Sequence, residues 1–280
     1  MKFNVKADLN YSTFEPAVII VNVHAARGSQ VILEENFIVT GDQHFTEVAS
    51  FPDQNRLIRI NTNSAGNIHC SYQAVVDNAF SVVNCENATP VGAWWLAPDV
   101  LCYLNPSRYC QSDKLFRLAT HQFGKINNDF EKVLAITEWI YSNVEYLSGS
   151  TNAETSAYDT VTQQAGVCRD FAHLGIALCR ALTIPARYCA VYAYQLVPQD
   201  FHACFEAFIA GRWIIFDATK LVPLNGLVRI AIGRDAADTA VANLFGNVMG
   251  NSVQVDSQVG DDGFQPYYYL SGRCEGISYA

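Results

Sequence analysis

The 280-residue sequence lacks any run of about 18 apolar residues, so we predict no membrane-spanning helix. Its first residues, Met1 to Asn10, lack the apolar stretch that a secretory signal requires. We therefore predict a cytoplasmic protein. Basic residues are scarce as well, because 18 Lys and Arg stand against 27 Asp and Glu, a net charge of −9. This balance disfavours a phosphate-binding surface, so we expect neither a nucleic acid nor a membrane as partner. The composition does not determine the oligomeric state.

Paired cysteine motifs are missing too. The nine cysteines are an odd number spread from Cys70 to Cys274, and none stands in a Cys-x-x-Cys pair. In a reducing compartment this excludes a disulfide framework, and a structural zinc site would need closer spacing. We expect most of these cysteines to be small buried hydrophobic residues.

The sequence contains no internal repeat and no low-complexity tract. Half of its residues are hydrophobic and 16% are charged, which excludes a disordered chain because so much apolar surface can offset the ordering entropy. Short apolar or alternating runs dominate the first hundred residues, and none of them has helical spacing. They predict an antiparallel β-sandwich domain over residues 1–102. The expected strands are residues 17–23, 31–33, 36–40, 56–60, 68–76 and 79–83.

The pattern changes after a connection marked by Pro90, Pro98 and Pro106. Helical spacing and capping residues predict helices, and three strand-like runs follow them. Helices followed by antiparallel strands indicate an α+β domain over residues 103–280. The expected helices are residues 112–123, 127–144, 158–164 and 168–182, and the expected strands are 186–194, 202–210 and 212–217.

Cys168 stands at the predicted start of helix 168–182. Unpaired backbone N–H groups and the positive end of the helix dipole lie there, and both stabilise a thiolate. A free thiol, with a pKa of about 8.5, is only a few per cent ionised at pH 7, so a catalytic cysteine needs such help. The position favours a nucleophile, and a buried helix residue is the alternative.

His202 and Asp217 begin and end the two strands of a predicted hairpin. With the turn at Gly211 and Arg212, opposite positions have numbers that sum to about 423, so Asp217 would face about Glu206. Both side chains would then lie near the same end of adjacent strands. A helix N-terminus facing this sheet would complete a set of nucleophile, base and orienting carboxylate. Spacing alone does not exclude a structural histidine and a turn aspartate.

Three stretches are more specific. Residues 166–174 (GVCRDFAHL) resemble the nucleophile motif of the bacterial transglutaminase-like superfamily. Residues 200–208 (DFHACFEAF) resemble its histidine strand, and residues 213–219 (WIIFDAT) resemble its aspartate strand. The β-rich start, residues 103–113 and residues 232–238 are also similar to parts of this family, whose members are often named cysteine proteases. The resemblance therefore covers nearly the whole chain.

This resemblance implies a papain/transglutaminase-like core in which a helix carrying the nucleophile packs on an antiparallel sheet. It implies Cys168 as the nucleophile, His202 as the general base and acid, and Asp217 as the carboxylate that orients the imidazole. The implied reaction is acyl transfer on a peptide or carboxamide through a thioester. Neither a metal nor another cofactor is implied, and the paired cysteine motifs of zinc-dependent relatives are absent.

The oxyanion would need two hydrogen-bond donors. The backbone N–H of Cys168 is the natural first donor, and the second stays open among four side chains: Gln163, Gln164, Trp139 and Tyr146.

Two positions depart from the family pattern. Ala218 stands where proline is common after the aspartate, and Cys204 stands where tryptophan is common. We expect Cys204 to widen the floor of the cleft and so to affect substrate preference.

Other candidates have structural explanations. We expect His173 to point away from the site, Asp235 and Asp238 to fix backbone or pair with an arginine, and Trp94–Trp95 to pack between domains. Two other functions remain: a non-catalytic protein-binding module that retains the fold, and an acetyl-CoA-dependent acyltransferase, for which no phosphate site is recognisable.

Overall fold

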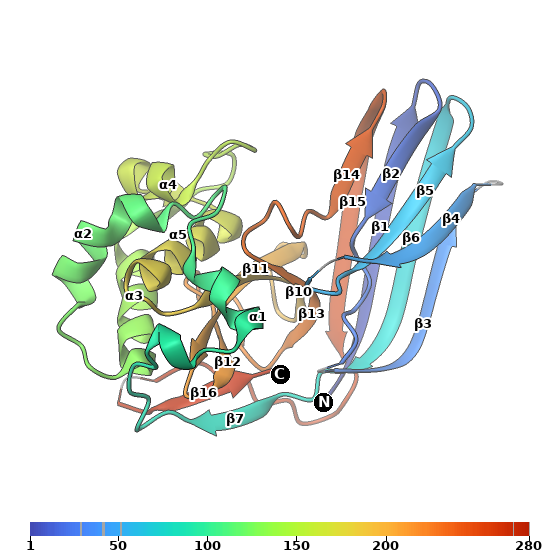
Figure 1. Ribbon diagram of the computed structural model, residues 1–280. Coiled ribbons are helices and arrows are strands. Elements are labelled where there is room, and N and C mark those ends of the chain that lie inside the picture. Colours follow the sequence, from blue (N-terminus) through green and yellow to red (C-terminus); the bar gives the residue numbers. More distant parts are fainter. Residues whose placement is uncertain (29, 41–42, 51, 271, 280) are drawn as a thin grey trace.

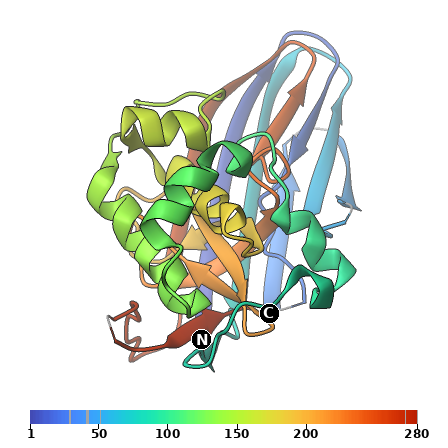
Figure 2. The same cartoon turned by 60° about the vertical axis from the view of Figure 1, so that its left-hand side comes forward.

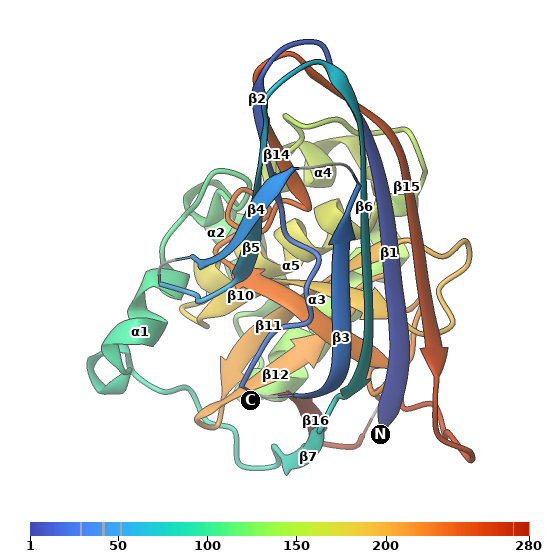
Figure 3. The same ribbon diagram turned by 90° about the vertical axis from the view of Figure 1, so that its right-hand side faces the viewer.

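The computed structural model describes residues 1–28, 30–40, 43–50, 52–270 and 272–279. Two antiparallel sheets lie face to face on one side of the molecule (right in Figure 1, front in Figure 3). The first, in the order β15-β1-β6-β3, contains β1 (Lys2–Thr13), β3 (Val31–Val39), β6 (Gly66–Asp77) and β15 (Val248–Val259). The second, in the order β14-β2-β5-β4, contains β2 (Ala17–Val21), β4 (His44–Ala49), β5 (Arg56–Thr62) and β14 (Ala242–Phe245). We call these two sheets the sandwich.

Alternation of buried and exposed residues builds the sandwich. In β1 every second residue from Phe3 to Tyr11 is buried, and Ile19 and Val21 of β2 are buried in the same hydrophobic cluster. Side chains alternate between the two faces of a strand, so one face of each sheet is free to form this core. The predicted strands 17–23, 56–60 and 68–76 are confirmed as β2, β5 and β6. Predicted strands 31–33 and 36–40 form the single strand β3, and predicted strand 79–83 lies outside the sandwich. The strands β1 and β4 were not predicted.

Two strands from the end of the chain complete the sandwich. β14 pairs with β2, and β15 pairs along the whole of β1. Residues 242–259 thus belong to the second half of the sequence but pack in the sheets formed by the first half. The predicted division between residues 102 and 103 therefore does not enclose the sandwich.

The connection after the sandwich is made of single turns: η1 (Ala93–Trp95), α1 (Pro98–Leu101) and η2 (Cys102–Leu104). The side chains of Trp94 and Trp95 are 87% and 80% exposed, so the prediction that they pack between domains is wrong. The η1 turn contains no buried residue, and it holds both indoles in solvent.

A group of helices covers the opposite side of the molecule, as the turned view in Figure 2 also shows. They are α2 (Ser112–Phe123), α3 (Asp129–Asn143), α4 (Ala157–Gln163) and α5 (Cys168–Ala181), all close to their predicted bounds. Asn128 caps the start of α3, because its Oδ1 accepts hydrogen bonds from the N–H groups of Phe130 (2.9 Å) and Glu131 (3.1 Å). Two short strands, β8 (Glu145–Tyr146) and β9 (Ala165–Gly166), pair beside the start of α5.

The third sheet lies between the helices and the sandwich (Figure 1). Its order is β12-β11-β10-β13, from β10 (Ala186–Ala193), β11 (Phe201–Ile209), β12 (Arg212–Phe216) and β13 (Leu227–Gly233). The β11–β12 hairpin pairs Phe205 with Phe216, so facing numbers sum to 421 and the predicted register is wrong by two residues. The reason is that Ala210 and Gly211 both have positive φ (51° and 76°) and form the two-residue turn themselves.

Side chains of the sandwich cap the outer edge of β13. Nε2 of Gln30 donates a hydrogen bond to the Arg229 carbonyl (2.7 Å), and Oε1 of Gln30 accepts one from the Arg229 N–H (3.0 Å). Asn55 makes the same two-way contact with Ile232 (2.7 and 3.0 Å). These bonds satisfy an exposed strand edge and join the sandwich to the third sheet.

A small sheet closes the end of the molecule at which both termini lie. It pairs β7 (Ser81–Asn84) with β16 (Glu275–Ser278). The whole is an α+β fold, as predicted, and all of its sheets are antiparallel except the short parallel pair of β8 and β9. None of the helices in the described ranges has both the length and the apolar character needed to cross a bilayer.

Candidate active site

Cys168 is the first residue of α5, as predicted, and its side chain is partly exposed. The Asp170 carboxylate one turn later accepts a hydrogen bond from the N–H of Val167 (3.0 Å) and fixes this helix end. From Asp170 onward the helix is buried. The thiol therefore lies where a buried helix first meets solvent, at the positive end of the helix dipole.

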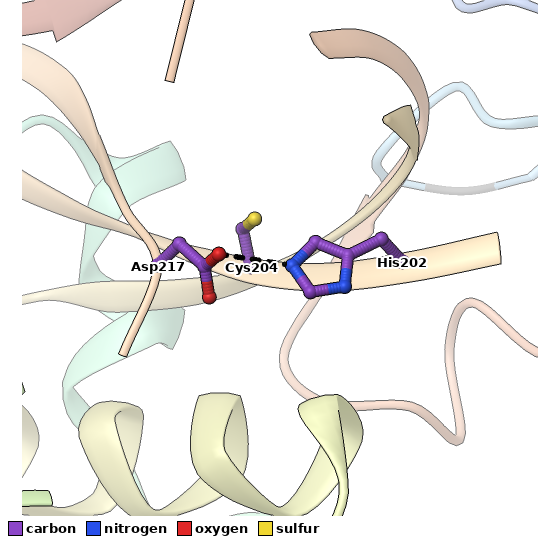
Figure 4. A group of neighbouring side chains, drawn as sticks. All are labelled: His202, Cys204 and Asp217. Atoms are coloured by element: carbon purple, nitrogen blue, oxygen red, sulfur yellow. Dashed lines mark hydrogen bonds and ion pairs between the residues drawn. The ribbon is translucent and has the colours of Figure 1, made fainter. Parts of the chain in front are cut away.

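His202 lies in β11 and Asp217 directly follows β12. The Nε2 atom of His202 is 3.1 Å from Oδ2 of Asp217, and Figure 4 shows the ring and the carboxylate pointing toward each other. An ionised carboxylate only accepts hydrogen bonds, so Nε2 carries a proton and Nδ1 is the ring nitrogen that can take up or release a second one. Nδ1 is buried and has no hydrogen-bond partner within the described part of the chain.

Thr219 holds the other oxygen of the carboxylate. Oδ1 of Asp217 accepts from the Thr219 N–H (2.9 Å) and from its hydroxyl (2.7 Å). Thr219 was not among the predicted site residues. The Asp-x-Thr spacing is the signal that could have identified it, since it is typical of a side chain that bonds its own backbone two residues on.

The charges of this pair support each other. Burial by itself lowers the pKa of His202, but the Asp217 carboxylate and contact with the Cys168 thiol raise it, and the net pKa lies well above the ordinary value. Burial raises the pKa of Asp217, and the imidazolium and Thr219 more than offset this, so the net pKa is lowered. The imidazolium and the carboxylate therefore each favour the charged form of the other.

Cys168 and His202 line one cavity of about 320 Å³. The contact with the thiol that raises the pKa of His202 indicates that the two side chains are neighbours. Because Nε2 is already bonded to Asp217, Nδ1 is the nitrogen left for the sulfur. The structure thus brings the three predicted residues together, although the register of their hairpin differs from the prediction.

Of the four predicted oxyanion side chains, Tyr146 lies beside Cys168. Its strand β8 pairs with Gly166, and its ring packs on Phe171, with centroids 5.7 Å apart. Burial raises the pKa of the Tyr146 hydroxyl, and Cys168 acts on that hydroxyl through both its thiol and its backbone N–H. The other three lie elsewhere: Trp139 packs on Phe123, and Gln163 and Gln164 are exposed at the end of α4.

Comparison with known proteins shows the family of this chain. The model of the transglutaminase-like superfamily matches residues 117–218, and that of the bacterial transglutaminase N-terminal domain matches residues 1–93. A solved structure described as a "Putative Cysteine Protease" from Cytophaga hutchinsonii is 52% identical. It aligns over 99% of this chain and 97% of its own, with a TM-score of 0.97. This chain belongs to the transglutaminase-like superfamily.

Curated relatives of this transglutaminase-like protein match over shorter spans. An uncharacterized protein of Mycobacterium leprae is 29% identical over 146 residues, which are 49% of this chain and 52% of that protein. An uncharacterized protein of Mycobacterium tuberculosis is 32% identical over 108 residues, 38% of this chain and 34% of that protein. The chain thus spans about half or less of the length of these relatives.

Cys204, where the family commonly has tryptophan, does not widen the cavity as expected. Its side chain is buried in a cluster with Cys189 and Ile215, while its neighbour Ala203 lines the cavity. Cys204 instead lies against the His202–Asp217 pair (Figure 4). The other departure, Ala218, is a buried core residue.

Ligand atoms of His202, Cys204 and Asp217 all lie within 4.8 Å of one another, a spacing that could hold a metal ion. The chemistry of the set does not fit one well. Burial, with Asp217 adding to it, raises the pKa of Cys204 to about 12, so this sulfur is a neutral thiol and a poor ligand. His202 and Asp217 are already bonded to each other.

The supporting residues behave as expected for structural roles. His173 accepts a hydrogen bond from the Ala236 N–H at Nε2 (3.1 Å), and burial lowers its pKa to about 3, so its ring is neutral. Asp235 accepts from the N–H of Tyr109 (2.9 Å), and Asp238 pairs with Arg234 (2.9 Å).

Proposed function

We propose that this protein catalyses cysteine-dependent acyl transfer at a peptide or carboxamide carbonyl, with Cys168 as nucleophile. Membership of the transglutaminase-like superfamily supports the class of reaction. The observation that carries the proposal is that a partly exposed thiol at a helix N-terminus shares a cavity with an imidazole whose free nitrogen is Nδ1.

In the proposed reaction, the proton of the Cys168 thiol resides on His202 Nδ1, so a thiolate lies beside an imidazolium before the substrate binds. The sulfur attacks the carbonyl carbon, and the imidazolium returns its proton to the departing amine. Water or a second amine, deprotonated by His202, then attacks the thioester and releases the thiol. Asp217 keeps the ring oriented and stabilises its positive charge, while its own proton count stays unchanged.

We further propose Tyr146 as the second oxyanion donor beside the Cys168 N–H. A hydroxyl in contact with that N–H lies where the carbonyl oxygen would develop its charge. The variant Tyr146→Phe keeps the ring packing on Phe171 and removes only the hydroxyl. We expect kcat to fall by roughly 10²-fold with little change in KM. Tyr141→Phe is the matched control, because Tyr141 is an exposed tyrosine of α3. An unchanged kcat in Tyr146→Phe would remove Tyr146 from this role.

The variant Cys168→Ala tests the proposal. We expect it to abolish turnover of peptide and carboxamide substrates and to leave the melting temperature nearly unchanged, because the thiol is partly exposed. Cys179→Ala is the matched control from the same helix. Cys179 is fully buried, so this variant should lose stability and keep activity.

Reaction with iodoacetamide distinguishes the enzyme from a non-catalytic binding module. Near pH 6 we expect stoichiometric labelling of Cys168 before any other cysteine, because the adjacent imidazolium stabilises its thiolate. Labelling only above pH 8, at the rate of an ordinary thiol, would favour the binding module. Incorporation of an amine acceptor into product would then separate transamidation from hydrolysis.

A further inference from the structure

The cavity beside Cys168 has a chemical character that the proposed reaction does not explain. It extends from the thiol to the segment between β13 and β14, which crosses from the third sheet to the sandwich (Figure 1). Its volume of about 320 Å³ lies at the lower end of the range for small-ligand sites. A cavity of this size can hold one large side chain next to the reacting carbonyl.

Small apolar residues form the depth of this cavity. Ala190 of β10 and Ala203 of β11 are direct cross-strand partners, and both line it. Ala240 and Val241 of the crossing segment line it from the sandwich side. Since a methyl group is the largest side chain at three of these positions, the space between the two elements stays open.

Aromatic residues form the walls and are held in place. The Tyr109 ring stacks on His173, with centroids 5.0 Å apart and an interplanar angle of 8°, and its hydroxyl donates to the Ala153 carbonyl (2.8 Å). Tyr188 is buried, and Phe201 packs on Tyr192 at 5.5 Å. Walls held this way need little ordering when an apolar group binds.

The charged side chains that line the cavity are all basic. Among the described residues that line it none is acidic, and Arg169 is the one permanent cation. The guanidinium is tethered, because Nη2 donates to Asp170 Oδ1 (2.9 Å) and to the Asn152 carbonyl (2.7 Å). A lysine or arginine side chain of a substrate would enter beside this cation with no carboxylate on the lining to pair with.

We propose that this cavity selects substrates that carry a large apolar side chain, aromatic above all, next to the reacting carbonyl, and that it rejects cationic ones. The inference rests on the proposed function, since it assigns the substrate class of the same site. The burial of one aromatic side chain against apolar walls supplies the preference.

Three iodoacetamide reagents test this inference on the full chain. They share the reactive group and differ in the substituent on the amide nitrogen. They are iodoacetamide, N-(2-phenylethyl)iodoacetamide and N-(4-aminobutyl)iodoacetamide, with each rate on Cys168 divided by the rate of the same reagent on free N-acetylcysteine. We expect the phenylethyl reagent to gain at least tenfold over iodoacetamide and the aminobutyl reagent to gain nothing.

A pair of variants on the crossing segment checks that the gain comes from the cavity. Ala240→Phe places a ring in the cavity and should abolish the phenylethyl gain, which is measured as the ratio of the phenylethyl rate to the iodoacetamide rate on the same variant. Ala237→Phe is the matched control, because Ala237 is exposed on the same segment and does not line the cavity. It should keep the full gain.

The outcomes separate the two proposals. Equal normalised rates for the three reagents on the unmodified protein would overturn the substrate class and leave the nucleophile in place. A phenylethyl gain that survives in Ala240→Phe would place the binding of the arm outside this cavity and would also overturn the inference. Failure of iodoacetamide to label Cys168 would overturn the proposed function itself. The comparison of reagents requires no variant, so a misfolded Ala240→Phe would not prevent the test.

Discussion

At the scale of single residues, two opposing effects set the pKa of His202. Burial favours the neutral ring, and the carboxylate of Asp217 at 3.1 Å favours the charged ring. The carboxylate prevails because its charge acts over a short distance in a dry site, where water does not screen it. The state of the imidazole therefore depends on one neighbour.

The variant Asp217→Asn removes this neighbour and keeps its shape. The carboxylate no longer raises the pKa of His202 and burial still lowers it, so the pKa falls and the ring loses its proton at lower pH. We expect the alkaline limb of the kcat/KM profile to move to lower pH and kcat at neutral pH to drop by roughly 10³–10⁴-fold.

Asp200→Asn serves as the control for that variant, because Asp200 is exposed just before β11. Its pH profile should match the unmodified protein. If the alkaline limb of the kcat/KM profile does not move in Asp217→Asn, a group other than His202 determines that limb.

At the scale of elements, the close approach of α5 to β11 places Cys168 near His202. The approach depends on Gly175, because a Cβ atom there would lie 2.5 Å from Cε1 of Phe205. Phe205 is fully buried and stacks on Phe216, with centroids 5.6 Å apart, so its ring has little room to move. A larger residue would therefore push the helix off the sheet.

We expect Gly175→Ala to lower the free energy of unfolding by about 1–3 kcal/mol, measured by denaturant titration. Helix propensity alone would change stability in the opposite direction by about 1 kcal/mol, so the sign of the result decides whether packing prevails. Gly66→Ala is the control, since no atom lies within 4 Å of a Cβ placed there. A stabilised Gly175→Ala would mean that the contact relaxes.

At the scale of the whole molecule, the two halves of the chain depend on each other. The second half supplies β14 and β15 to the sandwich, and the first half supplies the amides of Gln30 and Asn55 to the edge of β13. One hydrophobic cluster contains Phe3 of the sandwich and Phe205 of the third sheet. This arrangement makes the folding of one half conditional on the other.

A fragment of residues 103–280 tests this dependence. Its β14 and β15 would lack partners, and the edge of β13 would lose its side-chain donors. We expect no cooperative thermal transition for the fragment alone and a restored transition when residues 1–102 are co-expressed. A fragment that melts cooperatively at the temperature of the full chain would show that the halves fold independently.

Local patterns in the sequence were sufficient for the helices and for most strands, whereas the resemblance to the transglutaminase-like superfamily assigned Cys168, His202 and Asp217 to one site. Caps, periodicity and turn residues act within a few positions, and helix 112–123 follows from them alone. The period-two pattern of β1 was also readable in the sequence, and its omission was an error of prediction.

Contacts between distant segments determined the rest. Pairing of β15 with β1 joins residues more than 200 positions apart, and no local signal encodes such a partner. The positive φ of Ala210 shifted the hairpin register by two residues, because a residue other than glycine rarely takes this conformation. Packing between elements acts only once the chain has folded. It decides that Tyr146, of the four candidate side chains, contacts Cys168, and that the indoles of Trp94 and Trp95 face solvent.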